Sequence, residues 1–226
     1  MSHEEPDYDA LAGAVSSVRR LISHLRKTQA PKSLLEEVGR EAEALAARLA
    51  PHDFAGPYSQ AVLEMRDGID HLQKTDDAGE FFPYSPIVGP LNPVAPPVEF
   101  QLIDREMLAT HTFDAPYTGP PTAVHGGVIA LVFDELLGSL GAMLDIGGFT
   151  GTLKVVYRSL TPLGKPIRMR GWVDRTEGVK VFIKGEMRTG EGEHERLCAE
   201  AEGIFIRPKS SVLEVALAQS RNDSTR

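Results

Sequence analysis

The chain has 226 residues, of which 42% are hydrophobic and 25% are charged. This composition is ordinary for a globular protein and excludes a disordered or fibrous one. The formal net charge of -8 argues against general binding to nucleic acid or to anionic membranes, because an acidic surface repels both. The single cysteine, Cys198, excludes an internal disulfide and a cysteine zinc cluster, and its sequence context favours a buried thiol over a reactive nucleophile.

The N-terminal stretch has neither the basic start nor the apolar centre of a signal peptide. No run of the sequence reaches the ~18 apolar residues that a membrane helix requires. We therefore expect a cytoplasmic protein without membrane insertion.

Residues 1–56 contain two runs of apolar residues at helical spacing. The first run holds Leu11, Val15, Val18, Ile22 and Leu25, and the second holds Leu34 or Leu35, Val38, Ala42, Leu45 and Leu49. Pro31 separates the runs, and Ser33 is a candidate N-cap for the second one. We expect a helical hairpin that packs on the main domain or on a partner chain.

Residues 57–97 are rich in proline and begin with a possible short helix over residues 60–72. The many prolines prevent a long helix or a central strand, so the aromatic residues of this segment are expected to anchor it to the core as a covering segment. Residues 209–226 are expected to be a C-terminal tail.

Residues 98–208 show the clearest secondary-structure pattern. Alternating apolar and polar residues predict strands over 98–104, 106–113, 151–159, 166–174, 179–189 and 196–206. Between the second and third strands, the apolar segment 127–144 predicts a buried helix. The fold class is therefore α+β, with an antiparallel sheet wrapped around a long central helix and an N-terminal helical extension. A helix that is apolar nearly all round must be buried nearly all round, so a second protomer is expected to cover the side that the sheet leaves open.

Two carboxylates, Asp134 and Glu135, interrupt this apolar helix. A carboxylate in such surroundings must be paired, have a raised pKa or point into a cavity, and raised carboxylates are frequent catalytic groups. Glu135 fits better as a salt-bridged or outward-facing residue, because one of two adjacent positions can face out. Asp134 is the better catalytic candidate.

The sequence His125-Gly126-Gly127 marks the beginning of the helix. The two glycines allow a ligand to approach the backbone, and the first N–H groups of a helix have no intrahelical partner. Together with the positive end of the helix dipole, they could hold the oxyanion formed from a carbonyl group. His125 could orient the loop or donate to the same oxygen, or it could be a structural turn residue.

Asp134 follows His125 by nine residues, which is about 13 Å and two and a half turns along a helix. Within one chain, the two residues are therefore predicted to lie far apart and on opposite faces. Two helices packed antiparallel across a dimer would bring the Gly127 end of one beside Asp134 of the other. The spacing predicts a dimer with composite sites.

The motif His125-Gly126-Gly127, followed after six residues by Asp134, resembles the signature of hotdog-fold thioesterases of the phenylacetate-degradation type. The segments 148–158, 161–164, 174–180 and 199–206 are similar to mitochondrial-type long-chain acyl-CoA thioesterases of the same superfamily. The resemblance covers about half of the chain and implies a hotdog fold. It also implies hydrolysis of a fatty or aryl acyl-CoA, a homo-oligomer that is a dimer or a dimer of dimers, and neither a metal nor another cofactor.

The resemblance also implies roles for individual residues. Asp134 would be the general base or the nucleophile, the Gly127 N–H with His125 nearby would bind the oxyanion, and Gly126 would lie against the substrate. Thr150 would place the attacking water or the carboxylate, although Thr152 could take over part of this role. The basic residues that would contact the CoA phosphates are Arg158 and Lys180.

Two other functions remain open from the sequence. One is a non-catalytic acyl-CoA-binding or regulatory module, which would not require Asp134. The other is a hotdog acyl-CoA hydratase or dehydratase. These enzymes typically present an aspartate and a histidine on the same segment, whereas Asp134 lies well inside the helix that follows His125.

Overall fold

The computed structural model describes residues 7–54, 58–60 and 75–207, and the predicted helix over 60–72 and the predicted tail lie almost wholly outside the described residues. The helices are α1 (Tyr8–Lys27), α2 (Lys32–Leu49), α3 (Ala78–Phe81) and α4 (Gly126–Met143), with the short 3-10 turns η1 (Ala50–His52), η3 (Ala115–Tyr117) and η4 (Gly192–His194). The strands are β1 (Gln101–Ile103), β2 (Glu106–His111), β3 (Phe149–Tyr157), β4 (Ile167–Glu177), β5 (Lys180–Thr189) and β6 (Arg196–Ile206).

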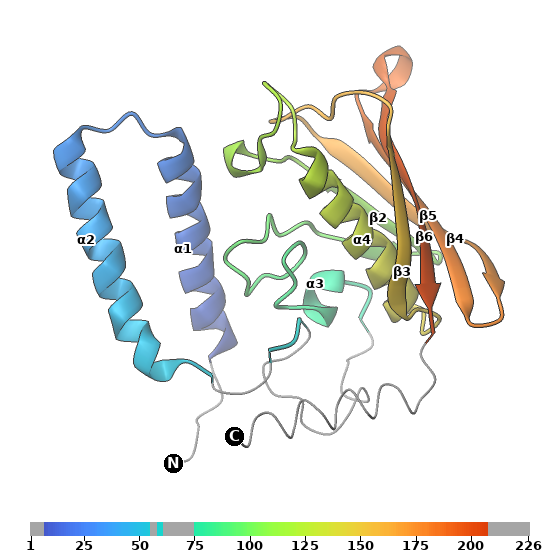
Figure 1. The fold of residues 1–226 in the computed structure, drawn as a ribbon, viewed down its shortest axis with the longest axis horizontal. Helices are drawn as coiled ribbons and strands as arrows, with labels where there is room; N and C mark the ends of the chain where they lie inside the picture. Colours follow the sequence, from blue (N-terminus) through green and yellow to red (C-terminus); the bar gives the residue numbers. More distant parts are fainter. Residues whose placement is uncertain (1–6, 55–57, 61–74, 208–226) are drawn as a thin grey trace.

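The strands form one antiparallel sheet in the order β1-β2-β4-β5-β6-β3. Alternate residues of each strand point inward, as the pleat requires, and on β5 the buried ones include Val181, Ile183, Gly185 and Met187. A Cβ atom at Gly185 would lie 3.0 Å from Leu137 Cδ2 of α4, so this glycine lets the helix lie close on the sheet. The sheet curls around α4 (Figure 1), which confirms the predicted hotdog architecture.

Helix α4 is the most hydrophobic element of the fold. Its 18 residues have a mean hydropathy of 1.5, enough to cross a membrane by length and composition alone, although Asp134 and Glu135 interrupt the apolar run. The reason lies in the fold, because Val132, Phe133, Leu136, Leu137 and Leu140 are completely buried in the core. A helix enclosed in this way needs the same apolar composition as a membrane helix.

Residues 75–97 of the proline-rich segment cover the side of α4 that faces away from the sheet (Figure 1). Its buried side chains include Ala78, Ile87 and Val88, which belong to the same hydrophobic core as α4. Ser85 Oγ accepts hydrogen bonds from the backbone N–H groups of Ile87 and Val88 at 3.1 and 3.2 Å. These bonds replace regular secondary structure in a segment where proline removes donors.

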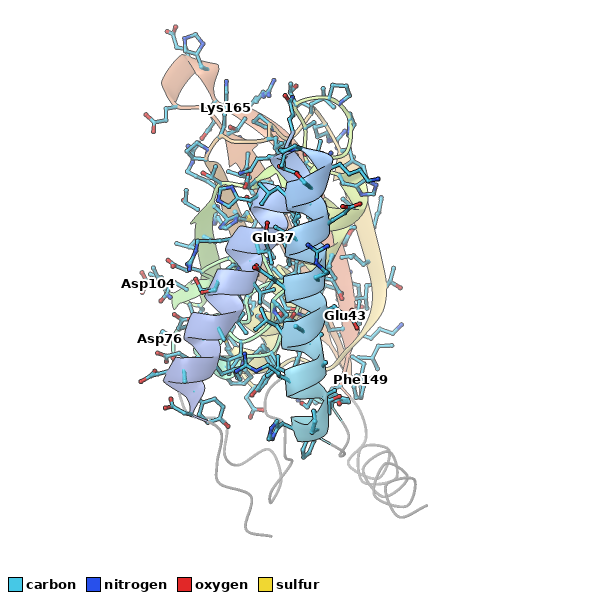
Figure 2. The ribbon with its side chains drawn as sticks, turned by 90° about the vertical axis from the view of Figure 1, so that its left-hand side faces the viewer. Glu37, Glu43, Asp76, Asp104, Phe149 and Lys165 are labelled. Carbon is cyan, nitrogen blue, oxygen red and sulfur yellow. The ribbon has the colours of Figure 1, made fainter. Side chains whose placement is uncertain are left out.

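Helices α1 and α2 stand side by side in front of this layer (Figures 1 and 2). Helix α1 is fixed to it by Arg19, whose guanidinium donates to the carbonyl oxygens of Gly89, Pro90 and Asn92, each at 2.8 Å. At the C-terminal end of the helix, Lys27 Nζ bonds the Asp114 carboxylate at 2.8 Å.

Helix α2 differs from α1 because it has no buried residue. The predicted cap at Ser33 is wrong: Pro31 occupies the N-cap position of α2, without a side-chain hydrogen bond. The extended backbone of Pro31 (φ -65°, ψ 155°) is the conformation that an N-cap residue adopts, and Ser33 lies in the first turn.

Candidate active site

Asp134 lies in the third turn of α4, and its carboxylate is half-buried. Thr150 Oγ1, at the beginning of β3, donates a hydrogen bond to Asp134 Oδ1 at 2.9 Å. The chain reaches this position through Gly148, where a Cβ atom would lie 2.0 Å from the Ile206 carbonyl oxygen. Only glycine allows this close approach. The structure therefore joins two of the predicted site residues within one protomer.

A bulge in β3 separates the two candidate threonines. Thr150 pairs with Phe205 and Thr152 with Ile204, so Gly151 is an extra residue on β3. An inserted residue breaks the alternation that would otherwise place both hydroxyls on one face. Among the described residues, the threonine that donates a hydrogen bond to Asp134 is Thr150.

The beginning of α4 is capped by His125. Its Nδ1 accepts a hydrogen bond from the Gly127 N–H at 3.0 Å, which requires an imidazole that carries no proton on Nδ1. The N–H that was expected to be a free oxyanion donor is therefore bound to the histidine in this structure. His125 is therefore an acceptor here, which agrees with the alternatives of a loop-orienting or structural turn residue rather than with a second donor.

Tyr157, at the other end of β3, also touches this helix terminus. Its hydroxyl donates to the Gly126 carbonyl oxygen at 2.8 Å, and its side chain is 52% exposed. Tyr157 was not among the predicted site residues, because strand alternation says nothing about contacts with a helix end. The signal that could have pointed to Tyr157 is its position next to Arg158, within the segment 148–158 that carries the family resemblance.

Gly127 and Asp134 lie on the same face of α4. They are seven residues apart, which is almost two full turns and about 10 Å along the axis. Leu131 lies between them on this face and is 43% exposed. His125 precedes the helix, as predicted. The Gly127 N–H and the Asp134 carboxylate, in contrast, share one open face of α4.

The two predicted phosphate contacts lie at opposite ends of the sheet. Arg158 follows Tyr157 and forms an ion pair with Glu200 of β6. Lys180 is exposed at the beginning of β5, opposite Ile206, which also pairs with the beginning of β3. Arg158 therefore belongs to the Gly127 end of the molecule and Lys180 to the Thr150 end.

The far face of the sheet carries a hollow of about 580 Å³. Its three arginines are paired with acidic residues: Arg168 with Glu195, Arg170 with Glu106, and Arg188 with Glu186. None of the predicted site residues lines it. The hollow is therefore separate from the residues discussed above.

The expectation for Glu135 is wrong. Its side chain points toward Ser85 and Ser139, and its Oε1 atom is buried with no hydrogen-bond partner among the residues that the structure describes. Burial raises the pKa of Glu135, and the neighbouring Asp134 charge raises it further, although the nearby Ser85 and Ser139 hydroxyl groups partly oppose the shift. Adjacent helix positions are about 100° apart, so the covering segment can enclose one carboxyl group while the other faces β3.

The raised pKa makes the stability of the protein depend on pH. Because the folded state binds this proton more tightly, the stabilisation is complete below the ordinary value of 4.5 and is lost as pH rises through the raised pKa. Glutamine resembles the protonated acid and cannot ionise. Glu135→Gln should therefore match the wild type near pH 4.5 and melt at least about 2 °C higher at pH 8.

Circular dichroism melts at both pH values measure this difference. Glu43→Gln, the same change on exposed α2, serves as the control and should change neither melt. A Glu135→Gln variant that melts below the wild type at pH 8 would contradict the assignment.

The sheet, the central helix and the residues at its two ends together define a protein of the hotdog class. A crystal structure of a thioesterase superfamily protein superposes on this chain with a TM-score of 0.72 and 32% sequence identity, covering 87% of this chain and 94% of that one. The chain belongs to the thioesterase superfamily.

Curated proteins give a narrower match. The acyl-coenzyme A thioesterase THEM4 of Xenopus laevis is 36% identical over 89 residues, and that of Bos taurus is 32% identical over 91 residues. Each alignment spans 39% of this chain, but only 39% and 35% of the respective relatives. No protein-family model matches the chain.

Proposed function

We propose that the protein hydrolyses acyl-CoA thioesters to a carboxylic acid and CoA, without a metal or other cofactor. Membership of the thioesterase superfamily and the similarity to two proteins named acyl-coenzyme A thioesterase support this reaction. The observation that carries the proposal is the hydrogen bond from Thr150 to Asp134, on the same open face of α4 as Gly127.

The proposed site is shared between two copies of the chain. If two α4 helices pack antiparallel around a two-fold axis near Leu131, Gly127 of each copy lies beside Asp134 of the other, because the axis is midway between these positions. The partial exposure of Leu131 and the position of β3 at the edge of the sheet support this arrangement. Phe149 at the beginning of β3 is 60% exposed (Figure 2).

Asp134 and Thr150 of one copy would hold the attacking water. As general base, Asp134 takes a proton from the water while its oxygen attacks the thioester carbon. The carbonyl oxygen becomes an oxyanion, which receives a hydrogen bond from the Gly127 N–H of the other copy. The C–S bond then breaks, and the CoA thiolate takes up the proton. Direct attack by the Asp134 carboxylate, followed by hydrolysis of the anhydride, is the alternative sequence of steps.

The same arrangement supports the proposed phosphate contacts. In an antiparallel dimer, Arg158 at the Gly127 end of one copy approaches the Thr150 end of the other, where Lys180 lies. Arg158 would have to exchange its ion pair with Glu200 for a phosphate. An exposed ion pair contributes little free energy, so this exchange is feasible.

Release of free thiol from a panel of short-chain, long-chain and aryl acyl-CoAs tests the proposal. We expect turnover of at least one member by the wild type. Binding of acyl-CoA without cleavage would instead favour the non-catalytic binding module. Hydration of an enoyl-CoA without thiol release would favour the hydratase.

A further inference from the structure

A single peptide group at the beginning of α4 is hydrogen-bonded at both ends. Its carbonyl belongs to Gly126 and accepts from Tyr157 Oη at 2.8 Å. Its N–H belongs to Gly127 and donates to His125 Nδ1 at 3.0 Å. The three groups form a chain that runs from the tyrosine through the peptide to the imidazole.

The two ends of a peptide group are coupled. The group is planar, so a bond that fixes the direction of the C=O also fixes the direction of the N–H. A donor on the carbonyl oxygen also polarises the amide and strengthens its N–H as a donor. Tyr157 can therefore influence the Gly127 N–H without touching it.

The surroundings keep Tyr157 in this position. Its backbone pairs with Ala199 of β6, which is fully buried. A Cβ atom at Gly126 would lie 3.6 Å from the tyrosine ring, so the ring lies over this glycine at a distance that leaves room for about one methyl group. The helix start is held independently, because the Val124 N–H donates to the Thr161 carbonyl at 2.9 Å.

We infer that Tyr157 is a positioning residue that orients and polarises the Gly126–Gly127 peptide for binding the oxyanion. His125 Nδ1 holds the N–H in the absence of substrate and is replaced by the thioester oxygen when substrate binds. This inference rests on the proposed function, and it adds a residue and an exchange of acceptors to that function.

Tyr157→Phe tests the inference, because it keeps the ring and removes only the hydroxyl. We expect kcat to fall about tenfold while KM changes less than twofold, since the lost interaction acts mainly on the oxyanion. In the ligand-free protein, the Gly127 amide proton should shift upfield in the ¹H–¹⁵N spectrum, because a less polarised N–H bonds more weakly to His125. A structural role alone would not produce this combination.

Tyr58→Phe is the matched control. Tyr58 Oη also donates to a backbone carbonyl, that of Phe54, at 2.9 Å, and the change should affect neither kcat nor the Gly127 resonance. An unchanged Gly127 resonance in Tyr157→Phe, or a shifted resonance with unchanged kcat, would overturn the inference. If the wild type cleaves no acyl-CoA, the proposed function fails, and the resonance alone then decides whether Tyr157 controls this peptide.

Discussion

Replacing Asp134 with asparagine is expected to lower kcat for acyl-CoA hydrolysis at least ~100-fold. Asparagine has the same size and can still accept a hydrogen bond from Thr150, but it can neither take a proton from water nor attack the thioester. Release of free thiol, measured with the best substrate of the panel, gives this ratio directly.

Asp145→Asn provides the control, because Asp145 is an exposed aspartate just after the end of the same helix. Asparagine tolerates its positive φ of 54°, so both stability and turnover should remain near those of the wild type. Turnover in Asp134→Asn equal to that of the wild type would remove Asp134 from the mechanism.

Replacing Leu131 with arginine is expected to separate the two copies. It should also lower kcat for acyl-CoA hydrolysis by a factor similar to that expected for Asp134→Asn. Leu131 lies midway between Gly127 and Asp134 on the open face of α4, so the two-fold axis would bring two arginines together there. Burying like charges without partners costs several kcal/mol. Light scattering should show a dimer or larger assembly for the wild type and a folded monomer for the variant.

Ile103→Arg tests whether any exposed arginine has this effect. Ile103 is 50% exposed on β1, at the opposite edge of the sheet from β3, and its replacement should change neither assembly nor activity. A Leu131→Arg monomer with full activity would show that one chain contains a complete site.

The fold could be predicted because its elements leave strong periodic patterns in the sequence. The apolar run that became α4 was recognised within one residue at each end, and β6 was predicted with its observed bounds. The cap of α2 could not be predicted, since a serine near a helix start is a common cap but Pro31 already supplied the required backbone angle.

The site could be predicted only in part. Helical spacing separated His125 from Asp134, and the family resemblance pointed to Thr150, which the structure places against the Asp134 carboxylate. The burial of Glu135 depends on how the covering segment folds over α4, and no local pattern encodes that contact. Tyr157 contacts Gly126 from a strand that is distant in the sequence. This is also a tertiary contact, so the spacing of residues along the chain does not reveal it.

The most direct test of the shared site is a hybrid dimer of two inactive chains. One chain carries Asp134→Asn, and the other carries Gly127→Pro, which removes the proposed donor at a first-turn position where proline is tolerated. Each chain alone should be nearly inactive. A hybrid purified through two different tags contains one site with both defects and one intact site, so we expect about half of the wild-type thiol release. A hybrid as inactive as its two parents would contradict a site built from Gly127 of one copy and Asp134 of the other.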